Sequence, residues 1–206
     1  MPYQKKKLEK LNKFFKGELF AFVVDLSVDK EELWQRIGKK TRNMIRKGEK
    51  MGVEVKLAEK EKEFQEWWEI YSELTRIKKF GRQNQNLLRE LFQRKNLVRL
   101  FVAKKDSKII GGAFFLIDEY PMYWLGAVDR KYEDLASGHI NMWEAILAFK
   151  EKGFGILDLG GAVLDKKEGS TRFKKSFNGE MKKGYIYEIP INKFKMYFLK
   201  FISKFK

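Results

Sequence analysis

The chain has 206 residues, with 44 lysines and arginines against 28 acidic residues, which gives a formal net charge of +16. It contains no cysteine and one histidine, His139. Thiolate nucleophiles, disulfides, cysteine zinc sites and three-histidine metal sites within one chain are therefore excluded, and we expect no metal. The length favours one domain. The charge favours anionic partners such as nucleic acid, membrane surface or phosphorylated substrates, or else reflects a lysine-rich solvated surface.

The chain start is basic but lacks the features of a secretion signal. Residues 1–16 contain no continuous apolar segment of the kind found in signal peptides. No run in the sequence approaches the roughly 20 apolar residues of a membrane-spanning helix. We therefore expect a cytoplasmic protein, with a peripheral position at the inner face of the membrane as a further option.

The first predicted elements are a strand and a long helix. Residues 18–26 (ELFAFVVDL) form an apolar run of strand length, and Asp29 can cap a helix that follows. Apolar positions at helical spacing then predict one helix over residues 29–51. The opposite face of this helix is strongly basic and carries Lys39, Arg42, Asn43, Arg46 and Lys50.

The next part reads as a short strand at 53–57 and two helices at 60–78 and 87–95. The longer helix carries four aromatic side chains at helical spacing, which favours a core role over a binding role: Phe64, Trp67, Trp68 and Tyr71. Three apolar runs with short links then predict an antiparallel meander. These runs are residues 97–103, 109–117 and 122–128.

A polar loop leads to a helix predicted over 139–152, with Ser137 as its N-cap. A strand, a short element and a last strand complete the order, at 154–159, 169–180 and 184–191. This order predicts an α/β fold with a mixed, mostly antiparallel sheet flanked by helices. The predicted organisation is a basic segment, one domain and an amphipathic tail, at 1–17, 18–192 and 193–206. The tail, rich in lysine and phenylalanine, suits a helix docked on the domain or one at a membrane surface.

Four stretches in this order resemble the FemABX family, whose members have the GNAT fold. They are TRNMIRKGEKMGVEV, YSELTRIKKFGR, SGHINMWEAILAFKEKGFGILDLGG and GSTRFKKSFNGE. The likeness extends over about residues 18–190. It implies a GNAT fold that corresponds to the second of the two GNAT-like domains of FemABX enzymes.

The resemblance implies transfer of an aminoacyl group from aminoacyl-tRNA to an amine of a lipid-linked or nucleotide-linked peptidoglycan precursor, with no further cofactor. One alternative is an acyl-CoA-dependent N-acyltransferase. However, the stretch 133–138 (EDLASG) has a single glycine where ordinary GNAT enzymes carry a glycine-rich coenzyme A motif. A non-catalytic half-length module that binds RNA or membrane is another alternative. A homodimer would restore a second domain.

The resemblance places Lys174 in the catalytic cleft, where it would stabilise negative charge. Lys174 and Arg172 would serve the donor, and Lys175 is a further candidate for substrate binding. Arg42, Arg46 and Arg82 would serve the acceptor. Asp158 interrupts an apolar strand, and its carboxylate needs a partner, either the incoming amine or a structural cation. His139 is a candidate general base or a structural residue at a helix start.

Two further groups are candidate anion-binding residues. Arg42 and Arg46 are four residues apart on one helix face and can reach one phosphate. Arg76 and Arg82 flank a polar loop at a possible cleft mouth. Free N–H groups at Ser137 and Gly138 would hold an anion or an oxyanion at the helix start. For each of these residues, a solvated surface position or a simple cap is the alternative interpretation.

Overall fold

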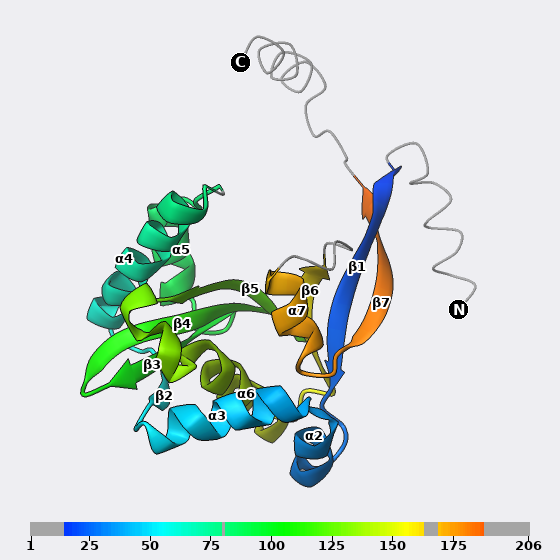
Figure 1. Cartoon of the computed structure of the whole chain (residues 1–206). Coiled ribbons are helices and arrows are strands. Elements are labelled where there is room, and N and C mark those ends of the chain that lie inside the picture. Colours follow the sequence, from blue (N-terminus) through cyan, green and yellow to red (C-terminus); the bar gives the residue numbers. More distant parts are fainter. Residues whose placement is uncertain (1–14, 80, 163–168, 188–206) are drawn as a thin grey trace, which may run out of the picture. The chain divides into compact units, whose positions relative to one another are not determined.

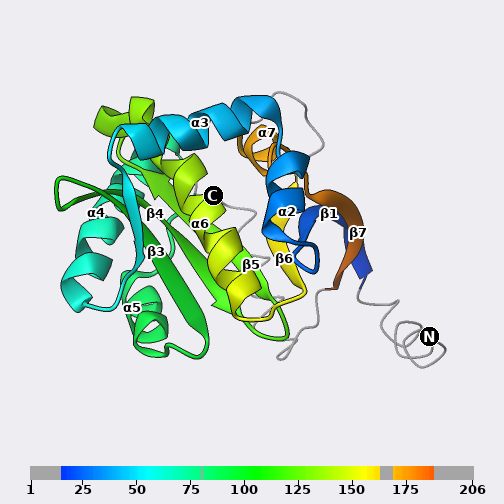
Figure 2. The ribbon, with the colours of Figure 1, turned by 90° about the horizontal axis from the view of Figure 1, so that it is seen from below.

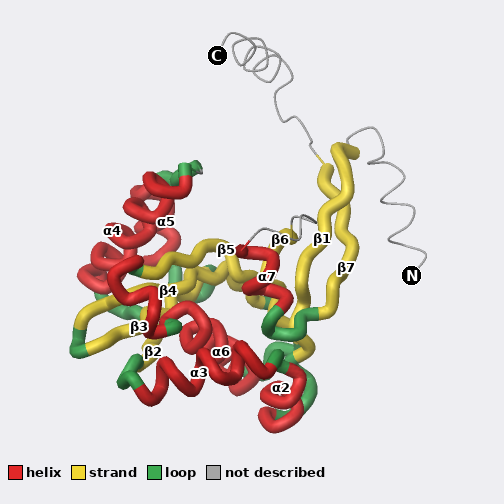
Figure 3. Tube along the Cα trace, viewed as in Figure 1, coloured by secondary structure: helices red, strands yellow, loops and turns green. Residues whose placement is uncertain are grey.

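The computed structural model describes residues 15–79, 81–162 and 169–187. Figure 1 and Figure 3 show the elements along the chain. In chain order they are β1 (Phe15–Asp25), α2 (Lys30–Arg36), α3 (Lys39–Lys50), β2 (Glu54–Leu57), α4 (Glu61–Lys78), α5 (Gln85–Gln93), β3 (Val98–Lys105), β4 (Lys108–Ile117), β5 (Pro121–Val128), the 3-10 helix η2 (Arg130–Leu135), α6 (Ser137–Glu151), β6 (Ile156–Ala162), α7 (Gly169–Lys175) and β7 (Glu180–Tyr187).

The strands form one seven-stranded sheet in the order β2-β3-β4-β5-β6-β1-β7. The neighbours from β2 to β5 are antiparallel, and β5 pairs with β6 in parallel. The predicted meander and the predicted mixed sheet are therefore confirmed. The chain divides into a larger unit, Ala21–Lys182, and a smaller unit that includes residues 15–20 and 183–187. All sites described below lie in the larger unit.

Alternating side chains of the central strands point into two separate cores. Leu100, Val102 and Phe114 pack in a core with α4 and α5. Phe101 and Phe115 pack in the other core, which includes residues of α6. Helix α3 packs against α6 on that second face and crosses it at an angle (Figure 2). The aromatic stripe of α4 is buried in the first core, as the helical spacing predicted.

The prediction of one helix over 29–51 is wrong, because the chain breaks between α2 and α3. Asp29 caps α2 as expected and accepts the N–H of Glu32 at 2.7 Å. Gly38 then adopts an extended conformation, and its N–H donates to the carbonyl of Ser176 at 3.3 Å. The Arg42 guanidinium stabilises the break, since it donates to carbonyl groups at the end of α2. The hydrophobic periodicity continues across the break and therefore did not reveal it.

The segment before α6 also differs from the prediction. The polar loop at 129–138 contains the 3-10 helix η2, capped by the Asp129 carboxylate, which accepts the N–H of Lys131 at 3.0 Å. Ser137 is not the N-cap of α6. Ala136 takes that position with φ 55°, so Ser137 is the first helical residue and is buried. The chain therefore turns sharply into α6, and the Ser137 hydroxyl points inward instead of capping the helix.

The other predicted boundaries agree with the structure to within a few residues, apart from the last strand. Strand β7 starts at Glu180, earlier than the predicted 184. The predicted residues 188–191, the segment 1–14 and the tail 193–206 lie outside the described residues. The domain boundaries expected at 17 and 192 therefore stay predictions.

Candidate functional site

Strands β5 and β6 meet at a single residue pair and then separate. Met122 pairs with Asp158, and no other pair joins these strands in the described chain. On its other side β5 pairs with β4 along most of its length. The register shifts at Phe114 and Phe115, which pair with Leu125 and Tyr123, so Trp124 is an extra residue. Such bulges change the direction of side chains beside functional sites.

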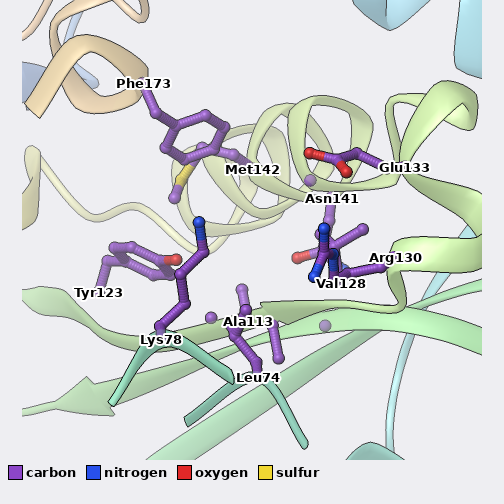
Figure 4. A pocket seen from close by; sticks show the side chains of 14 residues that line it. Leu74, Lys78, Ala113, Tyr123, Val128, Arg130, Glu133, Asn141, Met142 and Phe173 are labelled. Atoms are coloured by element: carbon purple, nitrogen blue, oxygen red, sulfur yellow. The ribbon is translucent and has the colours of Figure 1, made fainter. Parts of the chain in front are cut away.

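A cavity of about 270 Å³ lies along the separated edge of β5. Figure 4 shows its lining side chains, which come from α4, β4, β5, η2, α6 and α7. They are Leu74, Lys78, Gly112, Ala113, Tyr123, Gly126, Ala127, Val128, Arg130, Glu133, Gly138, Asn141, Met142 and Phe173. The cavity thus combines an apolar floor with a few polar groups, as is common for sites that bind small molecules or reactive groups.

The bulge sets the Tyr123 phenol over Gly126. Because Trp124 is the extra residue, Tyr123 and Gly126 project on the same side of β5. A methyl group at position 126 would overlap the Tyr123 hydroxyl. Burial raises the pKa of Tyr123 to about 12. The phenol therefore stays protonated at neutral pH and can donate a hydrogen bond within the cavity.

Charged side chains stand at two sides of the cavity (Figure 4). Lys78 ends α4, and its side chain extends into the cavity. Arg130 and Glu133 belong to η2 and stand at the opposite end. Glu133 is the only acidic residue among the described lining residues. The site thus offers two cations for a negatively charged donor or acceptor and one carboxylate for an amine.

The start of α6 lies against the cavity. Gly138 lines it, and a side chain there would approach Val128 Cγ2 at 3.4 Å. Asn141 is 2 % exposed, and its Nδ2 donates to the carbonyl of Phe101 at 3.0 Å. Its Oδ1 and the Ser137 hydroxyl are buried and have no hydrogen-bond partner within the described chain. A buried polar atom without a hydrogen bond is energetically costly. The Asn141 Oδ1 and the Ser137 hydroxyl could therefore form hydrogen bonds that the described residues do not supply.

Two of the predicted catalytic residues lie close to Tyr123. Lys174 Nζ donates to the carbonyl of Gly161 at 2.7 Å and lies 5.9 Å from the centre of the Tyr123 ring. Asp158 is the β6 partner of Met122. Its carboxylate accepts the N–H of Gly160 at 2.6 Å, a local turn contact where the sequence favoured an ion pair. The structure therefore brings Lys174 to the phenol where β5 and β6 separate, while Asp158 lies beside Met122 and its carboxylate is bound within β6.

His139 lies in an aromatic cluster on α6 beside α7. Its ring centre is 5.3 Å from that of Phe173 and 6.3 Å from that of Phe177. Burial lowers the pKa of His139, and the charge of Lys40 lowers it further. The imidazole is therefore neutral at pH 7, and its neighbours are mainly rings. It does not line the cavity, although its neighbour Phe173 does.

The arginines predicted to bind substrate do not line the cavity. Arg42 is partly buried and donates to carbonyl groups of residues 34, 35 and 37, so its guanidinium is already used at the α2–α3 break. Arg46 is exposed and lies over the Trp34 ring at 5.2 Å. Of the two arginines expected to bind one phosphate together, only Arg46 therefore has an exposed guanidinium that is not bound to backbone carbonyl groups.

The other predicted anion-binding residues lie on outer surfaces. Arg76 forms two hydrogen bonds with the Glu73 carboxylate, at 2.7 and 2.9 Å. Arg82 lies 5.6 Å from the Trp68 ring. Both line a separate hollow beside α4. Arg172 and Lys175 are exposed on α7, next to Lys174.

Five polar side chains of the cavity were not predicted from the sequence: Lys78, Tyr123, Arg130, Glu133 and Asn141. Tyr123 lies inside an apolar strand and Asn141 inside an apolar helix, where a single polar group is a usable signal. The bulge that directs Tyr123 inward has no comparable signal. Among the described residues, no group of three or more potential metal ligands occurs and no helix is long and apolar enough to span a membrane.

The protein is thus an α/β domain with a mixed sheet, whose parallel strands β5 and β6 separate beside a cavity at the start of α6. The family described as "Acetyltransferase (GNAT) domain" matches residues 35–175, more than half of the chain. The chain therefore belongs to the GNAT acetyltransferase family, and its FemAB-like character is confirmed. A search of curated protein sequences finds no match.

Solved structures with the same fold include two long proteins and a short one. FemX superposes with a TM-score of 0.71 at 12% identity, over 87% of this chain and 63% of FemX. L-PGS from Bacillus licheniformis has a TM-score of 0.65 at 14% identity, over 88% and 64%. An aminoglycoside acetyltransferase from an uncultured soil metagenomic sample has a TM-score of 0.54 at 17% identity, over 68% and 97%. This chain thus spans less than two thirds of FemX and L-PGS.

Proposed function

We propose that this chain transfers an aminoacyl group from aminoacyl-tRNA to an amine of a peptidoglycan precursor or a similar phosphate-bearing acceptor. The observation that carries the proposal is the cavity at the β5–β6 separation, with a protonated phenol and Lys174 beside it. An aminoacyl ester is already activated, so the site needs no strong nucleophile. Orientation of the amine, stabilisation of the oxyanion and removal of one proton are sufficient.

In this proposal the acceptor amine attacks the ester carbonyl, the C–N bond forms, and the C–O bond to the ribose breaks. The Tyr123 hydroxyl and the Lys174 ammonium stabilise the negative charge on the carbonyl oxygen. The amine loses one proton to Glu133, and Glu133 returns that proton to the ribose oxygen, which leaves as a hydroxyl. Lys78 and Arg130 hold the phosphates of a substrate.

A second candidate is N-acyl transfer from an acyl-coenzyme A. It is favoured by the unpaired edge of β5, because an extended donor arm can add to a strand edge through main-chain hydrogen bonds. Similarity to an aminoglycoside acetyltransferase, 97% of whose chain is covered, also favours it. The single glycine at the start of α6 favours the tRNA donor instead, since it leaves fewer backbone N–H groups for a pyrophosphate.

The test compares two donors with the same protein. Radiolabelled aminoacyl-tRNA, from total tRNA charged with mixed amino acids, and radiolabelled acetyl-coenzyme A are each incubated with a peptidoglycan precursor that bears a free amine. We expect transfer from aminoacyl-tRNA, and a fall of about 10- to 100-fold in Lys174→Ala. Arg46→Ala tests whether the remaining exposed arginine of α3 serves the acceptor.

Lys62→Ala is the matched control, because Lys62 is an exposed lysine of α4 with 86% of its side chain accessible. It should keep full turnover. Transfer from acetyl-coenzyme A alone would favour the second candidate. Binding of tRNA or anionic vesicles without transfer from either donor would indicate a non-catalytic module and contradict the proposal. Full turnover in a folded Lys174→Ala variant would contradict the role assigned to Lys174, and full turnover in a folded Arg46→Ala variant would show that Arg46 does not serve the acceptor.

A further inference from the structure

A second cavity lies where β2 and α5 end and β3 begins. Its volume is about 240 Å³, and it shares no lining residue with the cavity beside β5. Its apolar wall comprises Leu57, Ala58, Phe92, Val98 and Leu100. Lys95, Arg99 and Glu59 complete the lining. The residues proposed for acyl transfer have no part in it.

Two cationic side chains of this cavity hold buried donors without hydrogen-bond partners. Lys95 Nζ and Arg99 Nε are both inaccessible to solvent and find no acceptor in the described part of the chain. Lys95 Nζ lies 3.2 Å from the centre of the Phe92 ring. One other nitrogen of Arg99 donates to the carbonyl of Val98 at 2.8 Å. Each unpaired buried donor on a charged group is costly, so two together indicate a missing acceptor.

The nearby carboxylates do not fill this role. Glu63 accepts from Lys104 at 2.6 Å, and Glu61 accepts from Arg89 at 2.7 Å. Glu59 is exposed at the edge of the cavity, and no ion pair of its carboxylate is found among residues 15–79, 81–162 and 169–187. Burial lowers the pKa of Lys95, Glu59 opposes this effect, and the neighbouring Arg99 lowers it further. The positive charges of Lys95 and Arg99 thus lie close together, and neither forms an ion pair with a carboxylate of the described residues.

We infer that this cavity binds a carboxylate anion with a short apolar body. A carboxylate can accept from the Lys95 ammonium and the Arg99 guanidinium at once, after the lysine stem rotates away from the Phe92 ring. The apolar wall suits an aliphatic chain. The volume corresponds to about eight water molecules at roughly 30 Å³ each, which is room for an anion of hexanoate size.

The test uses the full chain and two probes of nearly equal shape, hexanoate and hexan-1-ol. Binding is followed by isothermal titration and by the amide chemical shifts of Ala58 and Leu100. We expect hexanoate to bind at least about tenfold more tightly than hexan-1-ol, since hydrogen bonds to charged groups contribute at least this factor. Lys95→Met and Arg99→Gln should each weaken hexanoate binding by about tenfold and leave hexan-1-ol binding unchanged.

Lys62→Met is the control, because it removes one positive charge from a solvated position and should bind hexanoate as the unaltered chain does. Equal affinity for the two probes would show a merely apolar cavity and would overturn the inference. So would an absence of hexanoate binding, or chemical shifts that move only at Gly138 and Asn141 beside the other cavity. These comparisons of probes on the unaltered chain do not depend on the folding of any variant.

Discussion

The meander of β3, β4 and β5 differs from the junction of β5 with β6 in how completely the strands are paired. In the meander, β4 pairs with a neighbour on each side along most of its length. At the junction, a single pair joins the two strands. The meander satisfies its main-chain groups internally, while the junction leaves main-chain groups of β5 available to a ligand.

The side chains follow the same division. Beside the meander, Trp67 stacks on Tyr71 and on Phe114, with ring centres 5.4 and 5.5 Å apart. Beside the junction, Tyr123, Asn141 and Ser137 carry polar atoms in or under the cavity. Substitutions in the two regions should therefore separate stability from activity, as expected when one part of a fold supplies rigidity and the other chemistry.

The largest expected effect is on stability, from a substitution in the aromatic core of the meander. Phe64 is fully buried on α4, with its ring centre 5.3 Å from that of Phe92. Phe64→Ala should lower the free energy of unfolding by about 3–5 kcal/mol, measured by urea denaturation. The folded fraction should keep its turnover. A variant that keeps its stability and loses turnover would contradict the division.

The next effect is on activity, from a substitution at the junction. Tyr123→Phe removes the hydroxyl and keeps the ring, so turnover should fall about 10- to 100-fold with a stability change below about 1 kcal/mol. The pKa of Tyr123 is raised from its ordinary value of 10.0 to about 12 in the folded protein. The protonated phenol therefore stabilises the fold below pH 10, and this contribution is lost as the pH rises from 10 toward 12. Ultraviolet titration of the phenol checks this window. Unchanged turnover would remove Tyr123 from the proposed chemistry.

The sequence predicted the fold well because its strands and helices have a clear hydrophobic period. It did not predict the break at Gly38, because apolar positions at 37 and 45 continue one helical period across it while Arg42 caps the first helix through tertiary contacts. Nor did it predict the first residue of α6. Ser137 follows the usual cap preference, but Ala136 in the left-handed region places it one position into the helix.

The site was only partly predictable for a related reason. Lys174 and Asp158 stand in recognisable segments, and the structure places Lys174 near the Tyr123 ring and Asp158 beside Met122. Tyr123 itself reaches the cavity because a bulge at Trp124 changes the direction of the chain. A bulge depends on pairing between strands, which the sequence of one strand does not encode. The surface arginines were predicted from their charge, helical spacing and position beside a loop, and none of these shows which guanidinium groups are already bound to other groups of the protein.

The smallest expected effect again lies in the meander, at a partly buried ion pair. Glu63 of α4 and Lys104 of β3 are 2.6 Å apart, with 17% and 23% of their side chains exposed. Burial alone would raise the pKa of Glu63, but hydrogen bonds from Lys104 and from the N–H groups of Glu59 and Lys60 lower it to about 2. Lys104→Met should therefore lower the free energy of unfolding at pH 7 by about 1–2 kcal/mol.

The pH dependence gives this prediction its sign. A carboxyl with a lowered folded-state pKa stabilises the protein above its ordinary value of 4.5, and this contribution is lost as pH falls from there toward 2. Urea unfolding of the unaltered chain should show that loss, and Glu63→Gln should flatten it over the same interval. Lys62→Met, which removes an exposed charge of the same helix, should keep the full dependence. If the Glu63→Gln variant also keeps the full pH dependence, the loss of stability in acid arises from other groups. The Glu63–Lys104 ion pair would then not hold α4 to the meander.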